Sequence, residues 1–136
     1  MDELLENPSE SECPPDWTVD SPAHLIVERN VIGANVGANG YTTLEQADEL
    51  ERLLRLQQDD RLLDIGAGRG WPGLYLAEKS GCEVTLLDTS DADLRRSVRR
   101  AEAANLLGRC SSFRGSAGAL PFRSRSFDAL IHTDVL

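Results

Sequence analysis

The fold of this chain is decided by one stretch, Arg61-Leu62-Leu63-Asp64-Ile65-Gly66-Ala67-Gly68-Arg69-Gly70. Its first half is a short apolar run typical of a buried strand, and three alternate glycines follow that run directly. Glycine permits a tight turn and a close approach of backbone to a ligand, because a Cβ would block both. The free amides at the start of the next helix can donate to a polar or anionic group. We therefore interpret this loop as a ligand-binding turn between a strand and a helix.

Regular hydrophobic periodicity surrounds this loop. The sequence predicts helices from a capping box at Thr42–Glu45 to near Gln58, from Trp71 to Lys79 with Pro72 at its start, and from a Ser90 cap to about Leu107 before Gly108. Further strands are predicted over residues 83–87, 110–113 and 127–132. Strands that alternate with helices imply crossover units. The predicted fold is α/β, a Rossmann-like, doubly wound parallel sheet with helices on both faces.

A carboxylate stands at the end of the second predicted strand. Asp88 closes Thr85-Leu86-Leu87-Asp88, twenty residues beyond Gly68. An acid at the carboxyl edge of the neighbouring strand can accept hydrogen bonds from the two hydroxyls of a ribose. The alternative is an aspartate that caps the next helix just before Thr89 and Ser90, and the two roles can coexist. The loop and the acid together predict a nucleoside-binding site.

These motifs resemble those of the class I S-adenosylmethionine-dependent methyltransferases, in particular the small-molecule enzymes whose loop has the form DxGxGxG. That loop is represented here by Asp64, Gly66, Gly68 and Gly70. The family's third signature is similar to residues 115–122, which end in Leu-Pro-Phe, and to Ser-Phe-Asp-Ala at 126–129. With the preceding helix, the resemblance covers roughly 95 of the 136 residues.

The resemblance implies S-adenosylmethionine as the cofactor and methyl transfer to an unidentified, small-molecule acceptor as the reaction. It implies that the loop glycines line the methionine and ribose, that Asp88 holds the ribose hydroxyls, and that Ser116 and Ala117 edge the adenine. It also implies that Asp64 helps to fix the loop and the methionine ammonium. The family often has Asp where this chain has Ser116, so the usual acceptor for the adenine amine is missing. The full set of expected cofactor-binding residues is Asp64, Gly66, Ala67, Gly68, Gly70, Asp88, Thr89, Ser116, Ala117 and His132.

Catalytic residues are less clearly indicated. His132, at the end of the fourth predicted strand, is a candidate general base for a hydroxyl or thiol acceptor, or a wall of the cofactor pocket. Tyr41 either covers the cofactor or is a surface aromatic. No metal site is expected, because Asp134 lacks the companion carboxylates that magnesium needs. The Asn-Pro-Pro-aromatic signature of many base and amide N-methyltransferases is absent, which argues against amino groups of DNA bases or glutamine as acceptors.

Charge and composition divide the chain into three parts. Residues 1–28 hold eight acidic residues and no Lys or Arg, so the net charge of −9 leaves about −1 for the remainder. We expect a flexible acidic tail over residues 1–20, a lead-in segment over 21–40 that its glycines break into loop, and the S-adenosylmethionine-binding domain over 41–136. The family's sheet has seven strands and four are predicted here, so we expect the domain to be incomplete at its C-terminus.

The same composition bears on partners and location. A net negative charge repels nucleic-acid backbones and anionic lipids, so neither a nucleic-acid nor a membrane partner is expected. No apolar run has the length of a membrane-spanning helix, and no secretion signal is recognised. Cysteines 13, 82 and 110 have neither zinc-site spacing nor a disulfide pattern, so we expect reduced thiols in a cytoplasmic protein. The oligomeric state is not indicated.

Two other functions fit parts of the pattern. Residues 68–73 satisfy GxGxxG, which is typical of nicotinamide-dependent oxidoreductases, but this match begins two residues too late after the strand and leaves the Leu-Pro-Phe and Ser-Phe-Asp motifs unexplained. A noncatalytic cofactor-binding module is the second alternative, for which Ser116 and the expected incompleteness of the domain leave room. Methyl transfer remains the preferred prediction.

Overall fold

The computed structural model describes residues 22–134, and the predicted acidic tail over residues 1–20 lies outside this range. The elements in chain order are α1 (Pro22–Ile32), α2 (Leu44–Leu54), β1 (Arg61–Ile65), α3 (Gly73–Ser80), β2 (Glu83–Asp88), α4 (Asp91–Ala103), the 3-10 helix η1 (Leu107–Arg109), β3 (Cys110–Arg114) and β4 (Ala129–His132). The four predicted strands and their alternation with helices are confirmed.

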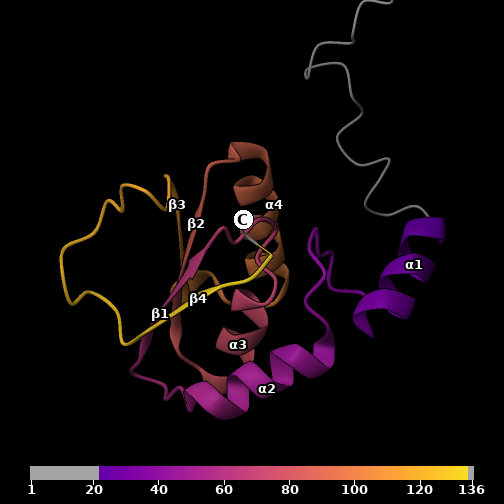
Figure 1. The fold of residues 1–136 in the computed structure, drawn as a ribbon, viewed down its shortest axis with the longest axis horizontal. Helices are drawn as coiled ribbons and strands as arrows, with labels where there is room; N and C mark the ends of the chain where they lie inside the picture. The colour runs from indigo at the N-terminus through magenta and orange to yellow at the C-terminus, as the bar shows by residue number, and fades with distance from the viewer. Residues whose placement is uncertain (1–21, 135–136) are drawn as a thin grey trace, which may run out of the picture.

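The four strands form one parallel sheet in the order β3-β2-β1-β4 (Figure 1). Successive crossovers carry the chain outward from β1 to β2 and β3, and the chain then returns to place β4 on the other side of β1. The strand order therefore reverses between β1 and β4. In open parallel sheets of this kind, ligands bind outside the carboxyl ends of the strands at such a point.

One face of the sheet is covered by α3 and α4, with α2 beside α3 (Figure 1). Leu62 of β1 and Leu86 of β2 are buried against this layer, together with Leu76 of α3 and Leu94 of α4. Burial of a side chain of this size stabilises the fold by about 1.5–3 kcal/mol. This cluster is the main core, and it fixes β1 and β2, whose carboxyl ends lie at the point where the strand order reverses.

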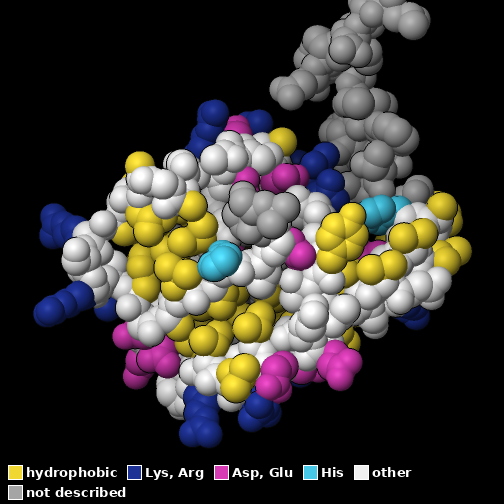
Figure 2. All heavy atoms as spheres, viewed as in Figure 1, with side chains coloured by type: hydrophobic (Ala, Val, Ile, Leu, Met, Phe, Trp, Pro, Cys, Tyr) yellow, Lys and Arg dark blue, Asp and Glu magenta, His cyan; other side chains and the backbone are white. Residues whose placement is uncertain are grey.

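The opposite face carries the alternate strand residues Leu63, Ile65 and Leu87, on which Phe122 and Phe127 pack from the loop before β4. The rings of these two phenylalanines meet edge to face, with centroids 5.0 Å apart. Figure 2 shows apolar side chains gathered on the side where this loop runs. Within residues 22–134 a loop and no helix lies here, so helix cover on both faces, as predicted, is observed on one face only in this range.

Two helices end earlier than their periodicity predicted. The helix expected to reach Gln58 ends at Leu54, because Arg55 adopts a left-handed conformation with φ 50°. The helix expected to reach Leu107 ends at Ala103 for a similar reason. Asn105 has φ 57°, and the amide of Leu106 turns back to donate to the carbonyl of Ala101 at 2.7 Å. Asparagine thus takes the left-handed position expected of glycine at a helix end.

The capping box of α2 also lies one residue later than predicted. Thr43, not Thr42, is the N-cap: its hydroxyl accepts from the amide of Gln46 at 3.2 Å, and the Gln46 side chain accepts from the amide of Thr43 at 2.9 Å. In the sequence, Thr42 with Glu45 and Thr43 with Gln46 both fit the pattern Thr-x-x-Glu/Gln. The hydroxyl of Thr42 instead donates to Asp134, 92 residues later in the chain.

The lead-in segment differs most from its prediction. Its first part is the helix α1, with Pro22 at a helix start, where the missing amide hydrogen carries no cost. The helix stops at Gly33, which has φ 94°, and only residues 33–43 form a loop. Ile32 and Ala38 pack with Trp71 in a second buried cluster. The lead-in therefore folds onto the domain and becomes part of it.

Two further observations bear on the sequence expectations. Over the residues that the structure describes, no helix has the length and apolarity to cross a membrane. Cys82 and Cys110 are free thiols, as expected, and Cys13 lies outside the described range.

Candidate functional site

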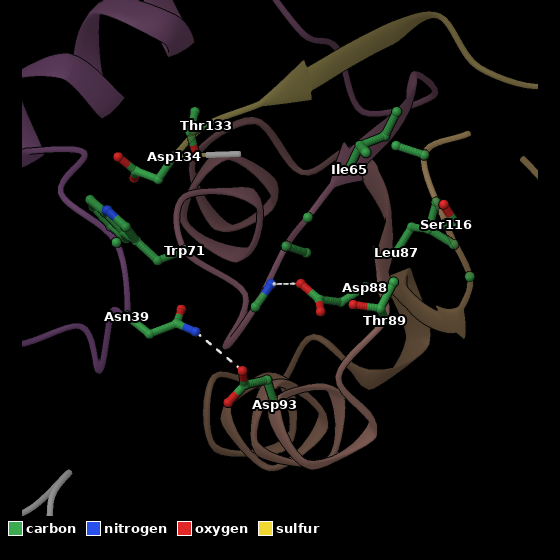
Figure 3. A pocket seen from close by; sticks show the side chains of 16 residues that line it. Asn39, Ile65, Trp71, Leu87, Asp88, Thr89, Asp93, Ser116, Thr133 and Asp134 are labelled. Carbon is green, nitrogen blue, oxygen red and sulfur yellow. Dashed lines mark hydrogen bonds between the residues drawn. The ribbon is translucent and has the colours of Figure 1, made fainter. Parts of the chain in front are cut away.

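A cavity of about 510 Å³ lies at the carboxyl ends of β1, β2 and β4 (Figure 3). It opens at the point where the strand order reverses, which is the expected place for a ligand. Its lining comes from the glycine loop, the ends of all three strands, the start of α4, the loop after β3 and the lead-in segment. The lining residues are Asn39, Gly40, Ile65, Gly66, Ala67, Gly68, Trp71, Leu87, Asp88, Thr89, Asp93, Gly115, Ser116, Ala117, Thr133 and Asp134.

The glycine loop forms the floor of this cavity. Gly66 and Gly68 have φ values of 68° and 53°, which residues other than glycine rarely adopt. The amides of Gly66 and Ala67 both donate to the carbonyl of Leu87, at 2.8 and 3.0 Å. The end of β2 therefore fixes the loop, and the backbone of the loop faces the cavity without side chains in the way.

Asp88 joins the glycine loop to the second strand and lines the cavity. One carboxylate oxygen accepts from the amide of Gly68 at 2.8 Å, and the other accepts from the amide of Ser90 at 2.8 Å. The bond from Ser90 fits the predicted turn before the helix, the bond from Gly68 was not predicted, and the role toward ribose hydroxyls stays a prediction. A carboxylate has about four acceptor positions. Two therefore remain for a ligand, which is the number that the hydroxyls of a ribose require.

Asp64 lies beneath the loop and does not line the cavity. Its side chain is fully buried, and one oxygen accepts from the amide of Gly73 at 3.1 Å. Among the described residues, the other oxygen has no hydrogen-bond partner. Burial raises the pKa of Asp64 to about 8, and the charge of nearby Asp88 contributes in the same direction. The predicted part in fixing the loop agrees with the bond to Gly73, and direct contact with the methionine ammonium stays a prediction.

Gly70 and His132 are also absent from the lining of the cavity. Gly70 has φ 91°, and a Cβ there would meet the Leu74 side chain at 2.5 Å, so this glycine serves the packing of α3. His132 pairs with Ile65 in the sheet and has an exposed side chain, whereas the next residues, Thr133 and Asp134, line the cavity. Tyr41 is 79% exposed and does not line it either.

The loop after β3 supplies another side of the cavity. The amide of Gly115 donates to the carbonyl of Asp88 at 3.0 Å, which holds this loop against the end of β2. Ser116 and Ala117, the two residues predicted to edge the adenine, both line the cavity. The Ser116 hydroxyl accepts from the amide of Gly118 at 3.1 Å. The two residues expected at the adenine therefore lie beside the one expected at the ribose.

Sequence reasoning missed the remaining side of the cavity. Asn39, Trp71, Asp93 and Asp134 all line it, and Figure 3 shows the Asn39 amide directed toward Asp93. Their bond is 3.2 Å long and joins residues 54 positions apart. Local periodicity contains no signal for such a contact. The one sequence signal for this wall was the set of glycines in the lead-in segment, which indicated that its backbone packs closely against another part of the chain.

The electrostatics of the cavity favour a cationic ligand. Its described lining includes the carboxylates of Asp88, Asp93 and Asp134, and no Lys or Arg. Arg69 and Arg96 lie nearby, with the Arg69 Nε 3.5 Å and the Arg96 Nη1 3.3 Å from one oxygen of Asp93, so the negative charge of Asp93 is offset and Asp88 and Asp134 are the remaining acids of the lining. A cavity lined by one sign of charge raises the local concentration of ligands of the opposite sign. A ligand with a nucleoside and positively charged groups matches both the acids and the open backbone.

Comparison with known proteins identifies the class. The model of a family described as "Methyltransferase domain" matches residues 62–136, which is more than half of the chain. The chain therefore belongs to the methyltransferase family, and the resemblance inferred from its motifs is confirmed. This assignment sets aside the oxidoreductase alternative.

Individual relatives agree with this assignment. The chain is 36% identical over 93 residues to 27-O-demethylrifamycin SV methyltransferase of Amycolatopsis mediterranei (strain S699), covering 65% of this chain and 34% of that protein. It is 35% identical over 81 residues to botryococcene C-methyltransferase of Botryococcus braunii, covering 60% of this chain and 21% of that protein. The structure is also similar to that of a SAM-dependent methyltransferase from Thiobacillus denitrificans in complex with S-adenosyl-L-homocysteine. The TM-score is 0.59 at 30% identity, and the match covers 66% of this chain and 36% of that protein. The chain thus spans between about a fifth and about a third of the length of the two curated relatives.

Proposed function

We propose that this chain binds S-adenosylmethionine in the cavity at the ends of β1, β2 and β4 and supports methyl transfer to a small-molecule acceptor. The observation that carries the proposal is Asp88, which spans from the Gly68 amide to the cavity and keeps acceptor positions free. A ribose laid against Asp88 has the glycine loop on one side and Ser116 with Ala117 on the other. This arrangement supports adenine at the β3 loop and methionine toward the end of β4.

The residues of the cavity fit the cofactor in charge as well as in shape. S-adenosylmethionine carries a sulfonium, an ammonium and a carboxylate, so its net charge is positive, and the acids that line the cavity give the cavity a negative potential. When bound, S-adenosylmethionine supplies an activated methyl group. The contribution of this chain is then to hold and align it and to exclude water around it.

Deprotonation of the acceptor is a separate requirement that depends on its chemistry. A hydroxyl or thiol acceptor needs a base near the end of β4, where His132 stands. His132 is exposed beside the cavity-lining Thr133, so it is available to an acceptor that approaches from solvent. We propose His132 as a residue that contacts the acceptor and not the cofactor. The free thiols Cys82 and Cys110 support our proposal of a cytoplasmic location.

The experiment is a calorimetric titration of the full chain with S-adenosylhomocysteine and, separately, with NADH. We expect the homocysteine nucleoside to bind and Asp88→Ala to weaken binding by about tenfold or more, since ligand hydroxyls lose a charged acceptor. Asp128→Ala is the matched control, because Asp128 also accepts a backbone amide, that of Arg61 at 2.8 Å, at the opposite end of the sheet. Binding of NADH alone, or no binding to a folded sample, would refute the proposal.

A further inference from the structure

The lead-in loop contributes one wall of the cavity, and we call its residues 36–42 the strap. Asn39 and Gly40, at the middle of the strap, line the cavity. Thr42, at its end, is buried and leads directly into the capping box of α2. The strap therefore runs over the open side of the site without belonging to a helix or strand, so its place depends on side chains from elsewhere.

Two carboxylates from distant parts of the chain hold the strap by its backbone amides. One oxygen of Glu28, which is 5% exposed in α1, accepts from the amides of Val36 at 3.0 Å and Ala38 at 2.8 Å. At the other end, one oxygen of Asp134 accepts from the amides of Tyr41 at 2.9 Å and Thr42 at 3.1 Å, and from the Thr42 hydroxyl at 2.8 Å. Hydrogen bonds to a charged acceptor are stronger than neutral ones.

Close packing shows that the strap is fitted to these partners. A Cβ on Gly40 would lie 2.4 Å from an oxygen of Asp134, so only glycine leaves room for that carboxylate. A Cβ on Gly68 would lie 2.5 Å from the side-chain oxygen of Asn39. The glycines of the strap and of the cofactor loop are thus complementary to side chains on the opposite wall. The wall as a whole is matched to the glycine loop.

Trp71 connects the same wall to the start of α3. Its indole Nε1 donates to the carbonyl of Thr42 at 2.7 Å, and its ring is 8% exposed while lining the cavity. Thr42 is therefore held on three sides: by Asp134 at its amide and hydroxyl, and by Trp71 at its carbonyl. A displacement of the strap at this point changes the surroundings of the indole, so Trp71 reports on it.

We propose that Asp134 is a positioning residue that latches the strap to the end of β4 and so closes the wall that retains the cofactor. This inference rests on the proposed function, because it concerns the same cavity. Asp134 stands two residues after His132, the last residue of β4, at the side from which we expect the acceptor to approach. The latch therefore ties the cofactor wall to the acceptor side of the sheet.

The test measures dissociation of S-adenosylhomocysteine from the full chain by stopped-flow fluorescence of Trp71. The sequence holds two tryptophans, so Trp17→Phe is introduced in every sample and leaves Trp71 as the only indole. The variants are Asp134→Ala, Asp134→Asn and Thr42→Val, with Asp128→Ala as the control at the opposite end of the sheet. Hydrogen exchange at the amides of Tyr41 and Thr42 is followed in the same samples.

We expect Asp134→Ala to speed dissociation by about tenfold or more, since three bonds to a charged acceptor are lost. Asp134→Asn keeps an oxygen acceptor and should stay within about threefold of the unmodified rate, as should Asp128→Ala. Exchange at Tyr41 and Thr42 should rise in Asp134→Ala alone. Should Asp134→Ala fail to fold, Thr42→Val carries the test, with dissociation about threefold faster because one bond is lost.

Two results would overturn the latch. Unchanged dissociation in both Asp134→Ala and Thr42→Val would show that the strap does not retain the ligand. An equal increase of the dissociation rate in Asp134→Asn and Asp134→Ala would show that the charge itself is needed, which makes Asp134 a direct ligand and not a positioning residue. Failure of the proposed function is distinguishable from both, because the unmodified chain would then not bind S-adenosylhomocysteine at all.

Discussion

Asp88 accepts a hydrogen bond from the backbone amide of Gly68 at 2.8 Å, and this bond joins the loop after β1 to the end of β2 (Figure 3). The bond requires Gly68 to hold its left-handed conformation, with φ 53°. On its other side, Gly68 faces Asn39 of the strap so closely that a Cβ would lie 2.5 Å from the Asn39 oxygen. Gly68 is therefore the point at which the loop, the ribose acid and the strap meet.

Replacement of Gly68 by alanine tests this point. We expect Gly68→Ala to weaken binding of S-adenosylhomocysteine by at least about tenfold, because strain of about 1–2 kcal/mol at positive φ adds to displacement of Asn39. The matched control is Gly108→Ala, since a Cβ on Gly108 would meet nothing within 4 Å and its φ is not positive. Calorimetry measures both variants, and equal affinities would show that the loop tolerates a side chain.

Asp64 gives the stability of the fold a defined pH dependence. Burial raises its pKa to about 8, whereas the value in an unfolded chain is about 3.9. Between these values the folded state binds more protons than the unfolded state. The free energy of unfolding contributed by Asp64 is therefore complete below about pH 4 and is lost as the pH rises through about 8.

We expect Asp64→Asn to remove this dependence, because Asn keeps an oxygen acceptor for the Gly73 amide and carries no charge. The melting temperature of the variant, measured relative to the unmodified chain, should rise steadily between about pH 5 and about pH 8. Asp128→Asn, at an exposed position, should show a constant offset over the same range. A difference between Asp64→Asn and the unmodified chain that does not change with pH would mean that Asp64 is charged in the folded state throughout.

Ser116 stands where the family often has Asp, and restoring the acid tests the orientation of the adenine. We expect Ser116→Asp to strengthen binding of S-adenosylhomocysteine by about threefold to tenfold, because a carboxylate accepts from the adenine amine. S-inosylhomocysteine, which lacks the amine, should gain nothing. Ser124→Asp adds the same charge outside the cavity and controls for net charge. An equal gain for both ligands would place the adenine elsewhere.

The core beneath the site provides a stability prediction. Leu86 is fully buried in β2, where it pairs with Asp64 of β1, whereas Leu53 of α2 is 60% exposed. We expect Leu86→Ala to lower the free energy of unfolding by about 3 kcal/mol and Leu53→Ala to change it by less than about 0.5 kcal/mol. Urea denaturation measures both, and similar losses would contradict the assignment of this face as the core.

Much of this arrangement was predictable because its signals are local. The run Leu62–Ile65 and its following glycines define both a strand and the loop that must turn from it, and Asp88 follows from the same logic on the next strand. Ser116 and Ala117 were found through the motif around Leu-Pro-Phe. Of the residues predicted for the site in this way, Gly66, Gly68, Asp88, Ser116 and Ala117 line the same cavity, whereas Asp64 and Gly70 do not.

The strap was not predictable because its contacts are long-range. Thr42 and Thr43 both fit a capping box, and the choice between them depends on Asp134, 92 residues away from Thr42. The helix α1 was missed because the glycines that follow it dominated the local pattern, although its buried Glu28 holds the strap from the other end. In both cases, tertiary contacts decided between local alternatives.

The most direct test of the central claim is to map the bound ligand on this chain by NMR. Amide chemical shifts of isotope-labelled protein are recorded as S-adenosylhomocysteine is added. We expect the largest changes at Gly66, Gly68 and Ala117, with none at Leu130 on the loop-covered face of the sheet. Changes confined to the region of Leu130, with the glycine loop unaffected, would contradict the assignment of the cavity as the S-adenosylmethionine site.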